Sequence, residues 1–286
     1  MRVIYLDCGM GAAGDMLAAA LYELLDEEGR INFIETMNSL IPGKVQLSVR
    51  PETKCGIIGT HFDVLIDGEE EHSVDHHEHM HEHDHNGYVH HHCRNHDHKH
   101  LHDSDHIDNH HRHDHDHHSM ADIEAIINGF TGVSDEAKAH AINVYKIIAE
   151  AESAGHGRSV AEIHFHEVGT MDAVIDVTAV CILIDMIRSD KVYASAVRTG
   201  KGHVRCAHGI LPVPAPATAR ILLGIPTYAG NIDAELCTPT GAALIRNFTN
   251  EFREQPVMAV SKIGYGMGTK DFEIADCVRA FLGETY

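Results

Sequence analysis

One stretch of this chain cannot take part in a hydrophobic core. Between His72 and His118, 21 of 47 residues are histidine and ten are Asp or Glu. Few residues there are apolar, so burial could not offset the entropy lost on ordering the stretch. The sequence therefore predicts one main folded unit, residues 1–71 and 119–286, interrupted by a His-rich, metal-binding insertion at residues 72–118.

The composition of the insertion indicates metal binding. Neutral imidazole is the commonest protein ligand for late transition metals, and the interleaved acidic residues attract cations. A solvated, pH-responsive linker is the alternative interpretation. Copper binds more tightly than nickel or zinc at most nitrogen sites, so histidine content alone does not select the metal. The histidines that we expect to bind metal are His76, His77, His79, His81, His83, His90, His91, His92, His111, His113, His115 and His117.

Charge and cysteine usage exclude several classes of protein. A net charge of −21 argues against binding to nucleic acid or to anionic membranes. The seven cysteines are scattered, odd in number and without a CxxC pair, which suits a reducing compartment. The longest apolar stretch, near 173–187, is interrupted by Asp176 and Asp185 and is too short to span a bilayer. We expect a soluble, cytoplasmic protein.

The hydrophobic periodicity predicts a mixed arrangement of strands and helices. Because strict βαβ alternation is missing, the expected fold class is α+β (mixed α/β). Expected strands cover 3–6, 45–49, 62–66, 163–168, 258–263 and 278–282, and expected helices cover 12–25, 134–153, 172–187 and 240–252, with one more beginning near Pro214 and Pro216. The glycine-rich segment 264–272 does not resemble a plain strand, and we interpret it as a bend facing the substrate.

The strongest candidate site is the sequence EIHFHEVGTMDAVIDV, residues 162–177. If 163–168 is a strand, His164 and His166 share one face of it. Asp172 and Asp176, four residues apart, would share one face of the next helix. With Glu167 at the end of the strand, these side chains could form the shell of a divalent metal. The alternative is that His164 packs in the core while the carboxylates cap or solvate the helix.

A second candidate is the turn DCGMGAAGDM. Asp7 ends a strand, where α/β folds place functional residues, so we expect it to be catalytic. Gly9, Gly11 and Gly14 would let backbone amides approach an anionic substrate near the start of a helix. Asp15 would bind substrate or, alternatively, cap the helix.

Further candidates for substrate binding lie in the second half of the chain. They are His203 and His208, which flank Cys206 on a predicted strand and loop, and Thr238 and Thr240, whose hydroxyls precede a helix. Isolated residues of these types are more often structural.

Several of these motifs resemble one known family. YLDCGMGAAGDM, KCGIIGTHFDV, the His-rich insertion, EIHFHEVGTMDAVIDV, AHGILPVPAPA, CTPTGAALI and GYGMGTKDF follow one another in order. Together they resemble the nickel insertion protein of nickel-pincer cofactor biosynthesis, the LarC family, along essentially the whole chain.

The resemblance implies a reaction that residue spacing alone does not. Family members insert Ni(II) into pyridinium-3,5-bisthiocarboxylic acid mononucleotide, a CTP-dependent, lyase-class (cyclometallase) reaction that uses Mg²⁺ or Mn²⁺. His164 or His166 would then remove the ring proton, and the other would hold nickel with Asp172 or Asp176. Longer relatives carry a further C-terminal domain, so the chain would need a partner chain. The competing hypotheses are a nickel or zinc storage protein or metallochaperone, and a metal-dependent hydrolase.

Overall fold

The computed structural model describes residues 1–286 except 42, 67–68, 71–117, 166 and 207–208. Its strands are β1 (Arg2–Asp7), β2 (Val45–Lys54), β3 (Ile57–Ile66), β4 (Glu69–Glu70), β5 (His118–Ser119), β6 (His164–Phe165), β7 (Lys191–Ala194), β8 (Val197–Arg198), β9 (His203–Cys206), β10 (Gly209–Pro212), β11 (Thr227–Tyr228), β12 (Glu251–Phe252), β13 (Met258–Met267) and β14 (Cys277–Thr285). Its helices are α1 (Gly14–Tyr22), α2 (Glu27–Ser39), α3 (Met120–Gly129), α4 (Asp135–His156), α5 (Met171–Ile187), α6 (Pro216–Ile221) and α7 (Pro239–Phe248). The mixture of elements confirms the predicted fold class.

The main sheet has the strand order β12-β7-β1-β14-β13-β3-β2, and β4 pairs with the end of β3. β1 and β7 are parallel, whereas β1, β14 and β13 form antiparallel pairs. The sheet is therefore mixed, and its parallel neighbours β1 and β7 end at Asp7 and Ala194.

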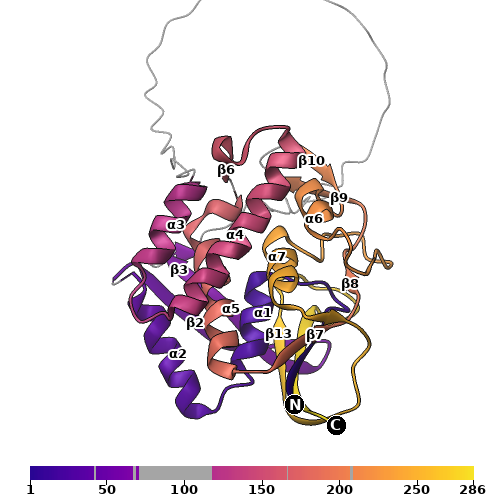
Figure 1. Ribbon diagram of the computed structural model, residues 1–286. Coiled ribbons are helices and arrows are strands. Elements are labelled where there is room, and N and C mark those ends of the chain that lie inside the picture. Colours follow the sequence, from indigo (N-terminus) through magenta and orange to yellow (C-terminus); the bar gives the residue numbers. More distant parts are fainter. Residues whose placement is uncertain (42, 67–68, 71–117, 166, 207–208) are drawn as a thin grey trace, which may run out of the picture.

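The helices are layered outward from this sheet (Figure 1). α1 packs on β13 and β3, α5 packs on α1, and α4 packs on α5. Gly264 and Gly266 permit the contact between α1 and β13. A Cβ on Gly264 would lie 1.9 Å from the Ala20 carbonyl oxygen, and a Cβ on Gly266 would lie 1.8 Å from the Met16 carbonyl oxygen. The predicted bend over residues 264–272 is thus wrong in its first part, since β13 continues to Met267. The glycines there serve helix packing.

Local signals explain where the helices begin and end. The Ser119 side chain accepts a hydrogen bond from the Asp122 amide, and the two residues form a capping box. Ser134 caps α4, which ends at Gly157 in a left-handed conformation (φ 64°). α7 ends at Phe248, four residues before the predicted end, because the chain turns there to pair β12 with β7.

One predicted strand is much shorter than expected. Instead of residues 163–168, only His164–Phe165 forms β6, and Glu167–Gly169 is a single 3-10 turn. β6 pairs with β5, so that His118 lies opposite Phe165 and Ser119 opposite His164. His166 lies outside the described residues, so a shared strand face for His164 and His166 stays a prediction.

Among the helices that the structure describes, none combines the length and apolar character needed to cross a bilayer.

Candidate functional site

Two of the motifs meet at the beginning of α1. Gly14 lies against Asp176 of α5 so closely that a Cβ there would be 3.1 Å from the Asp176 Cβ and 3.3 Å from its Oδ2. Asp15 follows in the first turn of α1. The glycine turn and the central motif, which the sequence presents as separate candidates, thus contribute carboxylates to one place. We call Asp15, Asp63, Asp172, Asp176 and Asp276 the carboxylate cluster.

β3 adds a histidine and a carboxylate to this cluster. His61 is buried, with its Nε2 2.7 Å from Asp63 Oδ1 and its Nδ1 3.0 Å from the Met267 carbonyl oxygen. The hydrogen bond to Asp63 raises the pKa of His61. Burial alone would raise the pKa of Asp63, but the hydrogen bonds and charges of His61 and Arg50 together outweigh burial and lower it. The pair is therefore a neutralised unit at the edge of the cluster.

The other carboxylates are in an unfavourable environment for negative charge. Burial raises the pKa of Asp176 well above its usual range, and the charges of Asp172, Asp15 and Asp63 raise it further. Burial also raises the pKa of Asp15, as does Asp63, with His61 opposing. Burial raises the pKa of Asp276 to about 6, and the charge of Asp15 contributes to the shift. Carboxylates crowded in this way gain most from a bound cation.

The backbone of the central motif is anchored beside the cluster. The buried Tyr145 hydroxyl donates to the Val168 carbonyl oxygen at 3.0 Å, and its ring packs edge-on against Phe165. His118 Nδ1 lies 2.9 Å from the Gly169 carbonyl oxygen. Gly169 is needed because a Cβ there would approach the Phe165 Cβ to 2.5 Å. The side chains of His164 and Glu167, and the whole of His166, lie outside what the structure describes.

Asp172 and Asp176 occupy the first turns of α5, as predicted. Thr170 caps this helix by accepting a hydrogen bond from the Ala173 amide. Both carboxylates therefore project from a fixed helix start beside the 3-10 turn.

Hydrogen bonds within the protein hold the glycine turn in place. Asp7 Oδ1 accepts a hydrogen bond from the Gly9 amide at 3.0 Å, and the Gly11 amide donates to the Cys8 carbonyl oxygen at 2.9 Å. Substrate binding by Gly9, Gly11 and Gly14 stays a prediction. Gly11 is required by its φ of 88° and by the Leu236 carbonyl oxygen, which a Cβ would approach to 1.8 Å. Ala13 occupies the N-cap position of α1, and the Asp15 carboxylate accepts a hydrogen bond from the Met16 backbone amide in the first turn. The substrate-binding role of Asp15 stays a prediction.

The remaining substrate-binding candidates are distributed differently. Thr238 caps α7 by accepting a hydrogen bond from the Gly241 amide, and its hydroxyl lies 2.9 Å from that of Thr240. His203 is exposed on the β9–β10 hairpin. His208 lies outside the described residues, as do His76, His77, His79, His81, His83, His90, His91, His92, His111, His113, His115 and His117.

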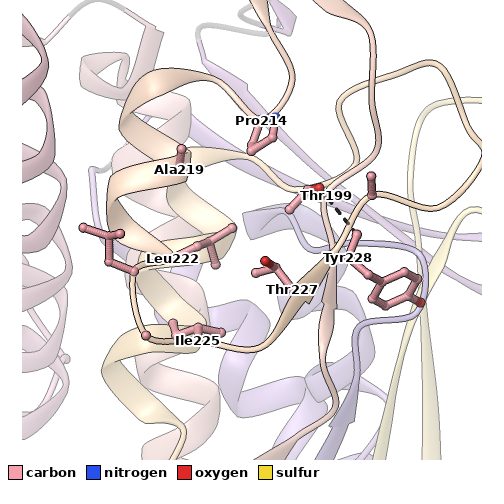
Figure 2. Close-up of a pocket in the computed structure, with 10 residues that line it drawn as sticks. Thr199, Pro214, Ala219, Leu222, Ile225, Thr227 and Tyr228 are labelled. Atoms are coloured by element: carbon pink, nitrogen blue, oxygen red, sulfur yellow. Dashed lines mark hydrogen bonds between the residues drawn. The ribbon is translucent and has the colours of Figure 1, made fainter.

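Two cavities lie near these elements. The first, of about 460 Å³, is lined by residues of α6 and the following loop together with Thr199 and Thr227, and no charged residue lines it (Figure 2). The second, of about 470 Å³, lies where β1 ends and is lined by Asp7, Gly9, Met10, Arg198 and Arg279, among others. We call it the arginine cavity. Asp7 Oδ2 pairs with the Arg279 guanidinium, whose Nε lies 3.0 Å away.

The chemistry of the two places is complementary. The carboxylate cluster offers oxygen ligands to a divalent cation, whereas the arginine cavity offers positive charge to an anion. Within the described side chains, no three His, Cys, Asp or Glu residues already stand at metal-ligating spacing.

Sequence reasoning missed several of these residues. His61 and Asp63 alternate along β3, a spacing that marks one strand face, but their partners come from distant segments. Arg198 could have been noticed as an arginine within a largely apolar stretch. The segment GTKDFEIAD contains Asp276 without any pattern that separates it from surface acids.

Comparison with known proteins identifies the family. Residues 4–286 match the family model described as nickel insertion protein. The chain belongs to this family. It is 42% identical, over 99% of its length, to the pyridinium-3,5-bisthiocarboxylic acid mononucleotide nickel insertion protein of Clostridium acetobutylicum, of which it covers 64%. Family members of the same name from Clostridium kluyveri and a Thermotoga species are each 37% identical and are covered over 62% and 61% of their lengths.

The chain thus spans less than two thirds of the length of these relatives in the nickel insertion family. No solved structure matches it significantly.

Proposed function

We propose that this chain carries the nickel-handling part of a protein that inserts Ni(II) into pyridinium-3,5-bisthiocarboxylic acid mononucleotide. Its relatives are named for that reaction and are similar over 99% of the chain. The observation that carries the proposal is the contact between Gly14 and Asp176, which joins the glycine turn to the central motif in one carboxylate cluster.

In this proposal the cluster holds the metal to be inserted. Asp172 and Asp176 bind nickel, as the sequence suggested. Asp15 joins them because its negative charge raises the pKa of Asp176. Oxygen ligands bind Ni(II) less tightly than several imidazoles would, which favours release to the sulfur atoms of the substrate. The paired His61 and Asp63 side chains together add no net charge to the cluster.

The ends of the His-rich insertion support a supply role for it. β4, just before the insertion, pairs with β3, which carries His61 and Asp63. β5, just after it, pairs with β6 of the central motif. Metal collected by the insertion would be released beside the residues that we assign to insertion. The insertion is then a metal reservoir and not the place of reaction.

Forming a carbon–nickel bond on a pyridinium ring requires loss of the ring proton. A base with a pKa near neutrality suits that step, and His164 or His166 remains our candidate. Glu167 and Asp7 are the other catalytic candidates, although Asp7 is engaged by Gly9 and Arg279. The resemblance further implies CTP with Mg²⁺ or Mn²⁺, and a separate C-terminal partner chain.

The test is an insertion assay. Purified chain, Ni(II), the bisthiocarboxylate mononucleotide, CTP and Mg²⁺ are mixed with and without a candidate C-terminal partner, and the nickel-containing product is followed by mass. We expect product in at least one of the two mixtures, and strongly slowed formation with His164→Ala or His166→Ala. Nickel binding without product in either mixture would favour a metallochaperone or storage protein. Unchanged rates in both variants would contradict the assignment of the base.

A further inference from the structure

Arg198 is a buried positive charge without a negative partner among the described residues. Its side chain is 6% exposed, and its NH2 group donates to Asn231 Oδ1 at 2.5 Å, while NH1 lies 3.3 Å from the Met10 sulfur. Its Nε has no hydrogen-bond partner. A guanidinium remains protonated in proteins, and a buried charge without a counter-ion is strongly unfavourable. An anionic ligand hydrogen-bonded to Arg198 would offset this cost.

The surroundings of Arg198 are built to hold it in place. Its backbone amide donates to the Cys8 carbonyl oxygen at 3.2 Å, which ties β8 to the glycine turn. Gly230 must be glycine, because a Cβ there would lie 2.3 Å from the Arg198 Nε. The backbone of Arg198 is thus tied to the glycine turn, and its guanidinium packs against Gly230.

Arg198 lines the arginine cavity, which has the position and size of a ligand site. The cavity lies where β1 ends, beside the parallel strand β7, and open α/β sheets bind ligands at the carboxyl ends of such strands. Its volume of about 470 Å³ is in the range of small-molecule sites. Of the acidic residues that line it, Asp7 is paired with Arg279 and Glu273 is exposed at the surface. Arg198 therefore remains available for a ligand.

We propose that the arginine cavity binds the phosphate monoester of the pyridinium mononucleotide substrate, with Arg198 as its principal ligand and Arg279 at its rim. This inference rests on the proposed function, in which the thiocarboxylates of the substrate face nickel and leave the phosphate as the remaining anion. The charges of the two sites favour the same orientation of the substrate. The carboxylate cluster repels the phosphate and attracts the metal, while the arginines do the reverse.

Two chain segments connect the cavity to the cluster. Gly9 and Met10 line the cavity and lead into α1, where Asp15 belongs to the cluster. Ala275 and Cys277 line the cavity on either side of Asp276.

Binding is measured with the full chain and three probes: nicotinic acid mononucleotide, its riboside without phosphate, and inorganic phosphate. We expect the wild-type chain to bind the mononucleotide at least ~10-fold more tightly than the riboside, as one charge-assisted, buried contact implies. Inorganic phosphate should raise the Tm of the wild-type chain. Equal binding of mononucleotide and riboside by the wild-type chain would overturn the proposal without reference to any variant.

Arg198→Met should abolish the preference for the mononucleotide and the Tm increase with phosphate, and Arg198→Lys should keep part of both. The matched control is Arg253→Met, because Arg253 is a half-exposed arginine that stacks on Tyr193 and pairs with Glu251. It should behave like the wild-type chain. An undiminished preference in Arg198→Met would overturn the assignment of Arg198. A clear phosphate preference in a chain that never inserts nickel would uphold this site and refute the proposed function, so the two failures are distinguishable.

Discussion

At the scale of one residue, Asp276 shows that a buried carboxylate of the cluster destabilises the folded protein when it ionises. The side chain is 5% exposed and accepts a hydrogen bond from the Lys270 amide at 3.3 Å. Burial raises its pKa from 3.8 to about 6. The folded protein therefore holds the Asp276 proton more tightly than the unfolded chain does. The contribution of Asp276 to stability is most favourable below pH 4 and declines as the pH rises towards 6.

Asp276→Asn should remove this dependence, since the amide oxygen can still accept from Lys270 and carries no charge. At pH 7 the variant should be more stable than the wild-type chain by about 3 kcal/mol, the free energy that corresponds to the shift. The difference should diminish as the pH falls from 6 to 4. Urea unfolding in the presence of a chelator, over pH 4.5–7.5, measures it. Glu284→Gln, at an exposed carboxylate, is the control, and an equal gain there would contradict the account.

At the same scale, the limits of prediction from sequence are clear. Asp172 and Asp176 could be paired because four residues separate them on one predicted helix. Asp63 and Asp276 could not be added, because they reach the cluster only through the parallel pairing of β13 with β3 and the turn after Met267. Such contacts depend on the register of strands far apart in the chain.

At the scale of elements, the contact between α1 and β13 positions the cluster. Gly264 and Gly266 bring the helix backbone onto the strand, and the beginning of α1 then carries Asp15 towards Asp176. The regular elements around it were predictable from periodicity and caps, as α4 and α5 show. The short length of β6 was not predictable, because its two residues are held by pairing with β5 and by the ring of Tyr145.

Gly266→Ala should separate α1 from β13. A Cβ there would lie 1.8 Å from the Met16 carbonyl oxygen, and backbone atoms cannot yield as a side chain would. We expect a loss of about 3 kcal/mol in the free energy of unfolding, together with weaker nickel binding. Gly129→Ala is the matched control, since Gly129 ends α3 with nothing near its Cβ position, and it should change stability by less than about 1 kcal/mol. Denaturant unfolding compares the two, and similar losses would refute the packing argument.

At the scale of the whole molecule, the insertion and the folded unit have separate tasks in our account. The chain before the insertion ends in β4 on β3, and the chain after it begins with β5 on β6. Replacing residues 71–117 by a short Gly/Ser linker should therefore leave the folded unit intact. In the insertion assay we expect the nickel concentration for half-maximal rate to rise, and the rate at excess nickel to stay the same. Loss of turnover at excess nickel would show that the insertion takes part in the reaction.

The central claim is that nickel binds at the carboxylate cluster of the folded unit. Equilibrium nickel binding to the chain with residues 71–117 replaced tests it most directly, because the abundant histidines no longer contribute. We predict one tightly bound nickel ion per chain, released as the pH falls and weakened ~10-fold or more by Asp176→Asn. A chain that binds no nickel once the insertion is gone, or whose remaining nickel is unaffected by Asp176→Asn, would contradict the account.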